Sequence, residues 1–162
     1  MCGESPARGG RAADPRCAIR SAVMSMLIKH ISVNVTDLEQ ARAFYEEVCG
    51  YRHVRTAHTT GFDGDHISCH LTDGNLDLTL LYYGEGGGSE KSPNAQPHIH
   101  HFGMEVENPD EFIQKVESWG GKVISPPGDV RVKFRIPNLP MLEIVPAGRW
   151  TKPIRKLMEK DT

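Results

Sequence analysis

The sequence lacks the features that mark three large classes of protein. The 162-residue chain has no excess of basic residues, since its net charge is -2 and its pI is about 6.4, and this argues against nucleic acid as a partner. No apolar run approaches the roughly 20 residues of a membrane helix. The four cysteines form no C-x-x-C pair and no disulfide pattern, which is typical of a reducing compartment. We therefore expect a cytoplasmic protein that binds neither nucleic acid nor a membrane.

The composition changes along the chain and divides it into parts. Residues 1–26 are rich in Gly, Ala, Pro and Arg and have no periodicity, so we predict a disordered N-terminal tail. Residues 85–97 contain a Gly-Gly-Gly-Ser run and Pro93, as a linker does. They separate two modules, 27–84 and 98–148, of one domain (27–148). Residues 149–162 are predicted to form a C-terminal arm.

The two modules repeat the same order of elements. In the first, polar and apolar residues alternate over 29–35, and Thr36 to Glu39 form a candidate capping box. Leu38, Ala41, Tyr45 and Val48 follow as a buried helical stripe, Gly50 is the expected left-handed stop, and strands are predicted near 52–57, 66–71 and 76–83.

The second module begins about 70 residues later with a strand over 99–106. Asn108 is the predicted helix cap and Pro109 the first helical residue. Phe112, Val116 and Trp119 form the predicted buried stripe, and strands are expected near 122–125, 130–136 and 141–146. The fold class is therefore α+β, built from two βαβββ modules, each of which is expected to be too thin to hold a core alone.

Histidines and carboxylates occupy matching places in the two modules. His30 and His101 open the first strand of each copy, while Asp77 and Glu143 lie between aliphatic residues in the last strand. Side chains alternate along a strand, so these groups are predicted to share an inner, polar face, and His100 is predicted to face away from it. Two imidazoles with one or two carboxylates suit a divalent metal: Zn, Ni, Co, Mn or Fe(II).

The sequence also resembles a known family. The segments from His30 to Tyr51 and from His101 to Ile144 are similar to the glyoxalase I/bleomycin-resistance/dioxygenase pattern of the vicinal oxygen chelate (VOC) superfamily. The resemblance implies paired modules around a U-shaped metal-binding cavity, often in a homodimer. It also implies that His30, Asp77, His101 and Glu143 correspond to the four ligand positions of glyoxalase-type members.

Three positions depart from particular members of that superfamily. Asp77 is shorter than the glutamate found in glyoxalase I, and the alternative to a fourth ligand is that its carboxylate stops short of the metal and holds a metal-bound water. Asn34 stands where that enzyme has an arginine that helps to hold glutathione, so glutathione dependence is not favoured. Lys133 stands where extradiol dioxygenases usually have a tyrosine.

We interpret the chain as an enzyme, a metal-dependent lyase or isomerase of the glyoxalase type, related to lactoylglutathione lyase. Its small-molecule substrate would chelate the metal through vicinal oxygens. Glu143 is predicted to be both a ligand and the catalytic base, with Asp77 as a second base or fourth ligand. The alternatives are an Fe(II) or Mn(II) extradiol-type dioxygenase and a metal-free protein that binds an antibiotic or another small molecule.

Five further residues are predicted to contact the substrate. They share a strand face with the candidate ligands or flank the predicted cavity: Asn34, His70, Tyr82, Glu105 and Trp150. For Trp150, the cavity and a dimer interface are both open as locations.

Overall fold

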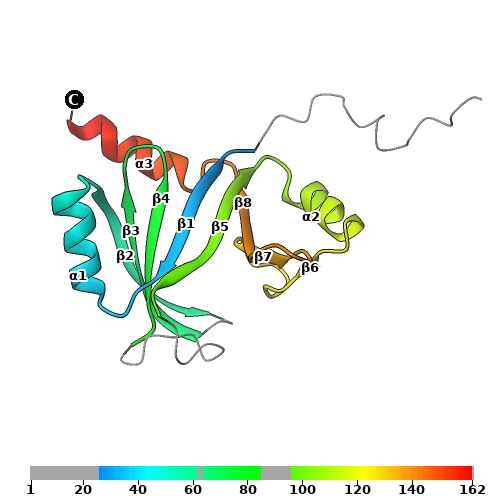
Figure 1. Ribbon diagram of the computed structural model, residues 1–162. Coiled ribbons are helices and arrows are strands. Elements are labelled where there is room, and N and C mark those ends of the chain that lie inside the picture. The colour runs from blue at the N-terminus through cyan, green and yellow to red at the C-terminus, as the bar shows by residue number, and fades with distance from the viewer. Residues whose placement is uncertain (1–25, 62–63, 85–95, 162) are drawn as a thin grey trace, which may run out of the picture.

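The computed structural model describes residues 26–61, 64–84 and 96–161 (Figure 1). The predicted tail (1–26) and linker (85–97) lie almost wholly outside the described residues. The first half consists of β1 (Ile28–Asn34), α1 (Leu38–Ala43) with a π-helical turn (Phe44–Val48), β2 (Arg52–Gly61), β3 (Gly64–Thr72) and β4 (Asp77–Tyr82). The second half consists of β5 (His98–Val106), α2 (Pro109–Ser118), β6 (Lys122–Val123), β7 (Val132–Arg135) and β8 (Leu142–Pro146). It is followed by α3 (Thr151–Met158) and a 3-10 turn (Glu159–Asp161).

The strands form one eight-stranded sheet in the order β2-β3-β4-β1-β5-β8-β7-β6. In each half the first strand pairs in parallel with the last, β1 with β4 and β5 with β8. The halves join through the antiparallel pair β1 and β5. The predicted α+β fold of two βαβββ modules is therefore confirmed, and both first strands lie side by side at the centre of the sheet (Figure 1).

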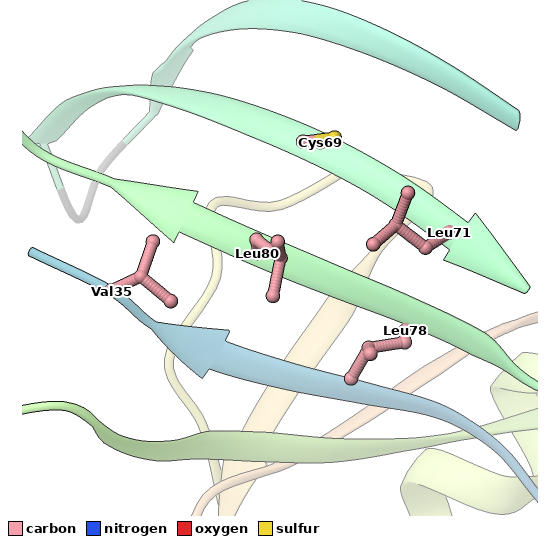
Figure 2. Close-up of a cluster of buried hydrophobic side chains, with 5 residues drawn as sticks. All are labelled: Val35, Cys69, Leu71, Leu78 and Leu80. Atoms are coloured by element: carbon pink, nitrogen blue, oxygen red, sulfur yellow. The ribbon is translucent and has the colours of Figure 1, made fainter. Parts of the chain in front are cut away.

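Each half has its own apolar cluster on the outer face of the sheet. The buried members of the first cluster come from the end of β1, from β3 and from β4: Val35, Cys69, Leu71, Leu78 and Leu80 (Figure 2). Leu38 of α1 and Tyr45 of the following π-helical turn pack against it. The second cluster joins α2 to β5, β7 and β8 through Val106, Val116, Phe134 and Ile144. Burial of each large aliphatic side chain contributes about 1.5–3 kcal/mol, so the two clusters on the outer face stabilise the fold. The polar side chains lie on the inner face.

The helix caps are partly as predicted. The first cap is Asp37, whose side chain accepts a 2.9 Å hydrogen bond from the backbone N–H of Gln40. Thr36 is therefore not the cap, and the capping-box prediction was one residue early. The second prediction is confirmed, because Asn108 accepts from the backbone N–H of Glu111 at 3.1 Å.

The last residue of each predicted buried stripe is exposed instead. Val48 is 70% exposed and Trp119 is 78% exposed. Val48 lies in the π-helical turn, whose wider i to i+5 spacing ends the 3.6-residue phase that buries Tyr45. Trp119 is the C-cap of α2 and lies beyond its last packed turn, which ends with Val116.

The C-terminal arm forms α3 and ties the two halves together. Trp150 and Ile154 are buried in a small cluster with Val145 of β8. At the other end of α3, Arg52 of β2 donates a 3.1 Å hydrogen bond to the carbonyl of Leu157. The arm therefore leaves the second half and returns over the first (Figure 1). None of the helices in the described ranges has the length and apolar character needed to span a bilayer.

Candidate metal centre

Three buried side chains converge on the inner face of the sheet. Nε2 of His30 lies 3.2 Å from Nε2 of His101, and that atom lies 3.2 Å from Oε2 of Glu143. All three donor atoms are within 4.8 Å of one another, and each residue is at most 4% exposed. Donors at about 2.0–2.2 Å from one ion would be about 3.0–3.4 Å apart. The spacing and the N2O1 donor set therefore fit a divalent metal such as Zn, Ni, Co, Mn or Fe(II).

The pairing of the strands explains why these residues meet. Asp77, His30, Gly103, Glu143 and Lys133 form one cross-strand row through β4, β1, β5, β8 and β7. Neighbouring strands are about 4.8 Å apart, so His30 and Glu143 lie two strands apart with only a glycine between them. A Cβ at Gly103 would lie 3.0 Å from Cβ of His30. The glycine thus gives the His30 ring room to turn toward the second half.

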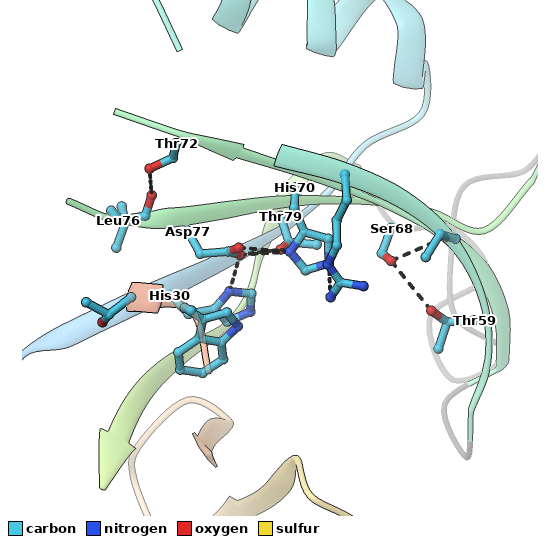
Figure 3. A network of polar contacts seen from close by, with 12 residues as sticks. His30, Thr59, Ser68, His70, Thr72, Leu76, Asp77 and Thr79 are labelled. Atoms are coloured by element: carbon cyan, nitrogen blue, oxygen red, sulfur yellow. Dashed lines mark hydrogen bonds and ion pairs between the residues drawn. The ribbon is translucent and has the colours of Figure 1, made fainter. Parts of the chain in front are cut away.

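Asp77 lies on the opposite side of the His30 ring from His101 and Glu143. Its Oδ1 is 2.8 Å from Nδ1 of His30 (Figure 3). A carboxylate only accepts, so Nδ1 carries the hydrogen and Nε2 keeps its lone pair for a ligand. Burial would raise the pKa of Asp77, but hydrogen bonds from His30 and His70 hold it well below its usual range. Asp77 does not belong to the three-residue group, and its geometry is that of a positioning residue for His30.

A second histidine extends this network to the edge of the cavity. Nδ1 of His70 is 2.9 Å from Oδ2 of Asp77, and its Nε2 is 3.1 Å from Nη2 of Arg55. Arginine only donates, so Nε2 accepts and Nδ1 donates. Burial lowers the pKa of His70 despite the opposing effect of Asp77, which favours the neutral ring. Thr79 donates to Oδ1 of Asp77 at 2.7 Å (Figure 3), and both carboxylate oxygens are thereby engaged.

His101 has a matching partner that strand alternation did not predict. Nδ1 of His100 lies 2.7 Å from Nδ1 of His101. The pairing of β1 with β5 shifts register between Ser32, opposite His101, and Val33, opposite Ile99. His100 is the extra residue of this bulge, and a bulge breaks the alternation of faces. For Nε2 of His101 to bind a metal, its Nδ1 must carry the proton and donate it to His100.

His30, His101 and Glu143 are called the triad below. The carboxylate of the triad is ionised at neutral pH. Burial would raise the pKa of Glu143, but its hydrogen bond with His101 and the charges of His101, His30 and Lys133 lower it to about 2. Burial likewise lowers the pKa of His101, against the effect of Glu143, and favours a neutral imidazole. An ionised carboxylate and neutral imidazoles are the forms that bind metals.

The triad opens into a cavity of about 250 Å³. Histidines, hydroxyls and cationic side chains dominate its lining, and the apolar contributions come from Val54, Leu81, Trp150 and Pro153. The indole of Trp150 stacks on the His30 ring at 4.6 Å with an interplanar angle of 5°. Two predicted substrate contacts, His70 and Trp150, therefore lie in the cavity wall.

The other three predicted substrate contacts lie elsewhere. Tyr82 packs against the first apolar cluster, because Asp77 and Thr79 face the cavity and alternation turns Tyr82 to the outer face. Glu105 accepts hydrogen bonds from the backbone N–H groups of Gly148, Trp150 and Thr151 and from the Thr151 hydroxyl, at 2.6–2.9 Å.

Asn34 is 1% exposed on the inner face of β1, beyond the residues that line the cavity. Its neighbour on that face, Ser32, does line the cavity but was not singled out as a contact. Alternation from His30 is the signal that would have found it. Arg131 directly precedes β7 and falls inside the predicted strand 130–136, so alternation with Val130 and Val132 is the signal that would have found it. Arg149 follows β8, where no strand pattern marks it.

Comparison with known families supports this description. Residues 27–136 match the family described as the Glyoxalase/Bleomycin resistance protein/Dioxygenase superfamily. The chain belongs to this superfamily. The match confirms the resemblance seen in the sequence, although Glu143 lies beyond the matched range. No curated protein matches this superfamily member.

Solved structures share its fold at low sequence identity. A hypothetical protein from Bacillus halodurans C-125 has a TM-score of 0.62 and 19% identity, with 75% of this chain and 94% of that one covered. Methylmalonyl-CoA epimerase from Mycobacterium tuberculosis has a TM-score of 0.61 and 17% identity, with 80% and 96% covered. A 4-hydroxymandelate synthase mutant from Streptomyces coelicolor has a TM-score of 0.60 and 16% identity, with 74% and 37% covered.

Proposed function

We propose that this protein is a metal-dependent lyase or isomerase of the glyoxalase type, which moves a proton on a small substrate that chelates the metal through two adjacent oxygens. The observation that carries the proposal is the convergence of the two Nε2 atoms of His30 and His101 with Oε2 of Glu143. Three protein ligands on one side of an ion leave positions for two substrate oxygens.

The chemistry divides between the metal and the chain. A divalent metal, when bound by this triad, supplies Lewis acidity that makes the hydrogen next to a carbonyl more acidic. Glu143 is ionised and lies in the cavity, so it is in the form that accepts this proton. Asp77 holds the His30 ring in the ligand orientation and is not itself the base, since His30, His70 and Thr79 occupy its oxygens.

The other cavity histidines are poorly placed to be the base. Both ring nitrogens of His70 are engaged, by Asp77 and Arg55. His66 precedes His70 by four residues on β3, which is about 13 Å along a strand. A base must come within hydrogen-bond reach of the proton that it removes, so Glu143 remains the best-placed acceptor.

The cavity lining favours a proton-transfer enzyme over the two alternatives. An extradiol-type dioxygenase with Fe(II) or Mn(II) would use the same triad, but Lys133 lines the cavity where such enzymes usually have a tyrosine. A metal-free binding protein would have no use for the contact between Asp77 and His30 that frees Nε2. Methylmalonyl-CoA epimerase, a structural neighbour, is an isomerase by name and is compatible with the proposal. Homodimer formation and cytoplasmic location remain predictions.

Metal analysis of the untagged full chain is the first test. About one divalent metal per chain is expected, and His101→Ala or Glu143→Ala should lower its affinity by about 100-fold or more. The matched control is His98→Ala, because His98 is exposed on the same strand. A triad variant that keeps wild-type metal affinity would contradict the proposed centre.

Isotope exchange then separates the proposed function from the dioxygenase. Small 2-hydroxy ketones and hemithioacetals are incubated with the metal-loaded protein in D₂O, and proton NMR follows exchange at the carbon next to the carbonyl. The proposal expects exchange that Glu143→Gln abolishes. Oxygen uptake on catechols without exchange on any carbonyl substrate would favour the dioxygenase instead.

A further inference from the structure

Cationic side chains from both halves of the protein surround the cavity. Arg55 comes from β2 in the first half, while Arg131, Lys133 and Arg149 come from the second half. Lys133 is buried in the row that contains Glu143. The three arginines lie nearer the solvent. The wall that holds the metal triad is therefore continuous with a positively charged rim.

The three carboxylates of the cavity do not fully offset its four cationic side chains, and each carboxylate accepts hydrogen bonds from groups other than the arginine side chains. Asp77 and Glu143 are engaged by histidines, and Asp129 accepts the backbone N–H of Arg131 at 3.0 Å. Among the described residues, the guanidinium groups of Arg131 and Arg149 form no ion pair with a carboxylate.

The arginines also influence one another across the cavity. Burial lowers the pKa of Arg55, and the charges of Arg149 and Arg131 lower it further, against the opposing effect of Asp77. Like charges that face each other destabilise the charged forms. An anion between them would remove this repulsion and gain charge-assisted hydrogen bonds.

A second feature of the cavity also indicates a polar ligand. Ser32 is fully buried and lines the cavity, in the cross-strand row that runs from Arg55 through His70 and Thr79 to His101. Its hydroxyl has no hydrogen-bond partner among the described residues. A buried hydroxyl without a partner costs about 1–3 kcal/mol, and a polar substrate that extends from the triad along this row would satisfy it.

From this charge distribution we infer that the substrate carries an anionic group, a carboxylate or a phosphate, beyond its metal-chelating oxygens. The rim formed by Arg55, Arg131 and Arg149 binds the anion, and the Ser32 hydroxyl contacts the segment between the two ends. The inference rests on the proposed function, because the triad holds the chelating end. The small cavity suits a compact substrate, since typical ligand pockets enclose about 300–1,000 Å³.

Three hydroxamates with the same chelating head provide the test. Acetohydroxamate is neutral beyond its head, N-hydroxysuccinamate adds a carboxylate, and phosphonoacetohydroxamate adds a phosphonate. Calorimetric titration of the Zn²⁺-loaded full chain should give at least about tenfold tighter binding for one or both acidic compounds, equivalent to one charge-assisted hydrogen bond. Which of the two gains more identifies a carboxylate or a phosphate as the natural group, and added salt should reduce the gain.

Two arginine variants link the gain to the rim. Arg131→Gln and Arg149→Gln should each reduce the affinity gain of the acidic compounds over acetohydroxamate by about threefold or more. The affinity for acetohydroxamate itself should stay unchanged, and this result also shows that the fold and the metal centre are intact. Arg55 is not used, because it contacts His70. Arg155→Gln is the control, since Arg155 is exposed on α3 and pairs with Glu159.

The outcomes separate the inference from the proposed function. If acetohydroxamate binds and the acidic compounds gain nothing, the anion site is refuted while metal chelation stands. If the acidic compounds keep their gain in affinity in both arginine variants, the anion site at the arginine rim is also refuted. If no hydroxamate binds the Zn²⁺-loaded protein, metal chelation fails, and the inference fails with it.

Discussion

Replacement of Asp77 by asparagine should weaken metal binding although Asp77 is not one of the three converging residues of the candidate centre. The carboxylate accepts from Nδ1 of His30, Nδ1 of His70 and the hydroxyl of Thr79. An asparagine has nearly the same shape, but only one of its two terminal atoms accepts. Its Oδ1 can keep the contacts with His30 and Thr79, and its NH₂ group then faces the N–H of His70.

The magnitude follows from these contacts. Loss of one charge-assisted hydrogen bond and the opposition of two donors should cost about 1.5–3 kcal/mol of folding free energy. The loss of negative charge beside His30 also makes this imidazole a weaker ligand. Replacement of such a partner typically lowers metal affinity by about 10–100-fold, which corresponds to about 1.4–2.7 kcal/mol.

Competition between the apo-protein and a chromophoric chelator for Zn²⁺ measures the change in affinity, and thermal unfolding of the apo-protein measures the change in stability. Asp129→Asn is the matched control, because Asp129 also lines the cavity and accepts a backbone N–H, whereas no histidine N–H of the described residues bonds to it. Wild-type Zn²⁺ affinity in Asp77→Asn, or an equal loss in Asp129→Asn, would show that Asp77 does not act through His30.

Three further substitutions test the surroundings of the centre. Gly103→Ala places a Cβ 2.6 Å from Cη2 of Trp150, so we expect about 1–3 kcal/mol of destabilisation and recovery when Trp150→Phe is added; no recovery would refute the clash. Glu105→Gln should lower Tm by about 2–4 °C at neutral pH. The lowered pKa of Glu105 means that its carboxylate stabilises the fold above pH 4.5, its unperturbed value, and that this contribution is lost as pH falls through the folded pKa. The Tm difference should therefore shrink in acid, and a constant difference would show that the hydrogen bonds from the backbone N–H groups of Gly148, Trp150 and Thr151 to the Glu105 carboxylate do not stabilise the fold. His100→Ala should lower Zn²⁺ affinity severalfold through the contact with His101, whereas unchanged affinity would show that His100 does not act through His101.

Most of the candidate site could be predicted from the internal repeat of the sequence. This repeat placed His30 and His101 at the start of the two central strands and Glu143 in the last strand of the second half. Alternation then put all three on one face. These are local rules of strand geometry, and they hold wherever the ladder is regular. The convergence of the donor atoms follows from them together with the central pairing of β1 with β5.

The role of Asp77 was not predictable from the repeat, because the two halves differ in register. His30 lies directly opposite Asp77 in the pairing of β1 with β4. Glu143 lies opposite Gly103, two residues along β5 from His101. The direct arrangement brings Asp77 to Nδ1 of His30, and the diagonal arrangement brings Glu143 to Nε2 of His101. A sequence repeat cannot reveal which register each pair of parallel strands adopts.

The bulge at His100 shows the same limit within a single strand. Strict alternation would turn His100 away from the centre, yet one unpaired residue in β5 brings it to His101. The bulge depends on how β5 pairs with β1, which is a contact between residues about 70 positions apart. The neighbours on both sides of His100, Ile99 and His101, look like ordinary strand residues. The partners of the two candidate histidine ligands must therefore be sought in the fold. Asp77 meets Nδ1 of His30 through the register of a parallel strand pair, and His100 meets Nδ1 of His101 through a bulge.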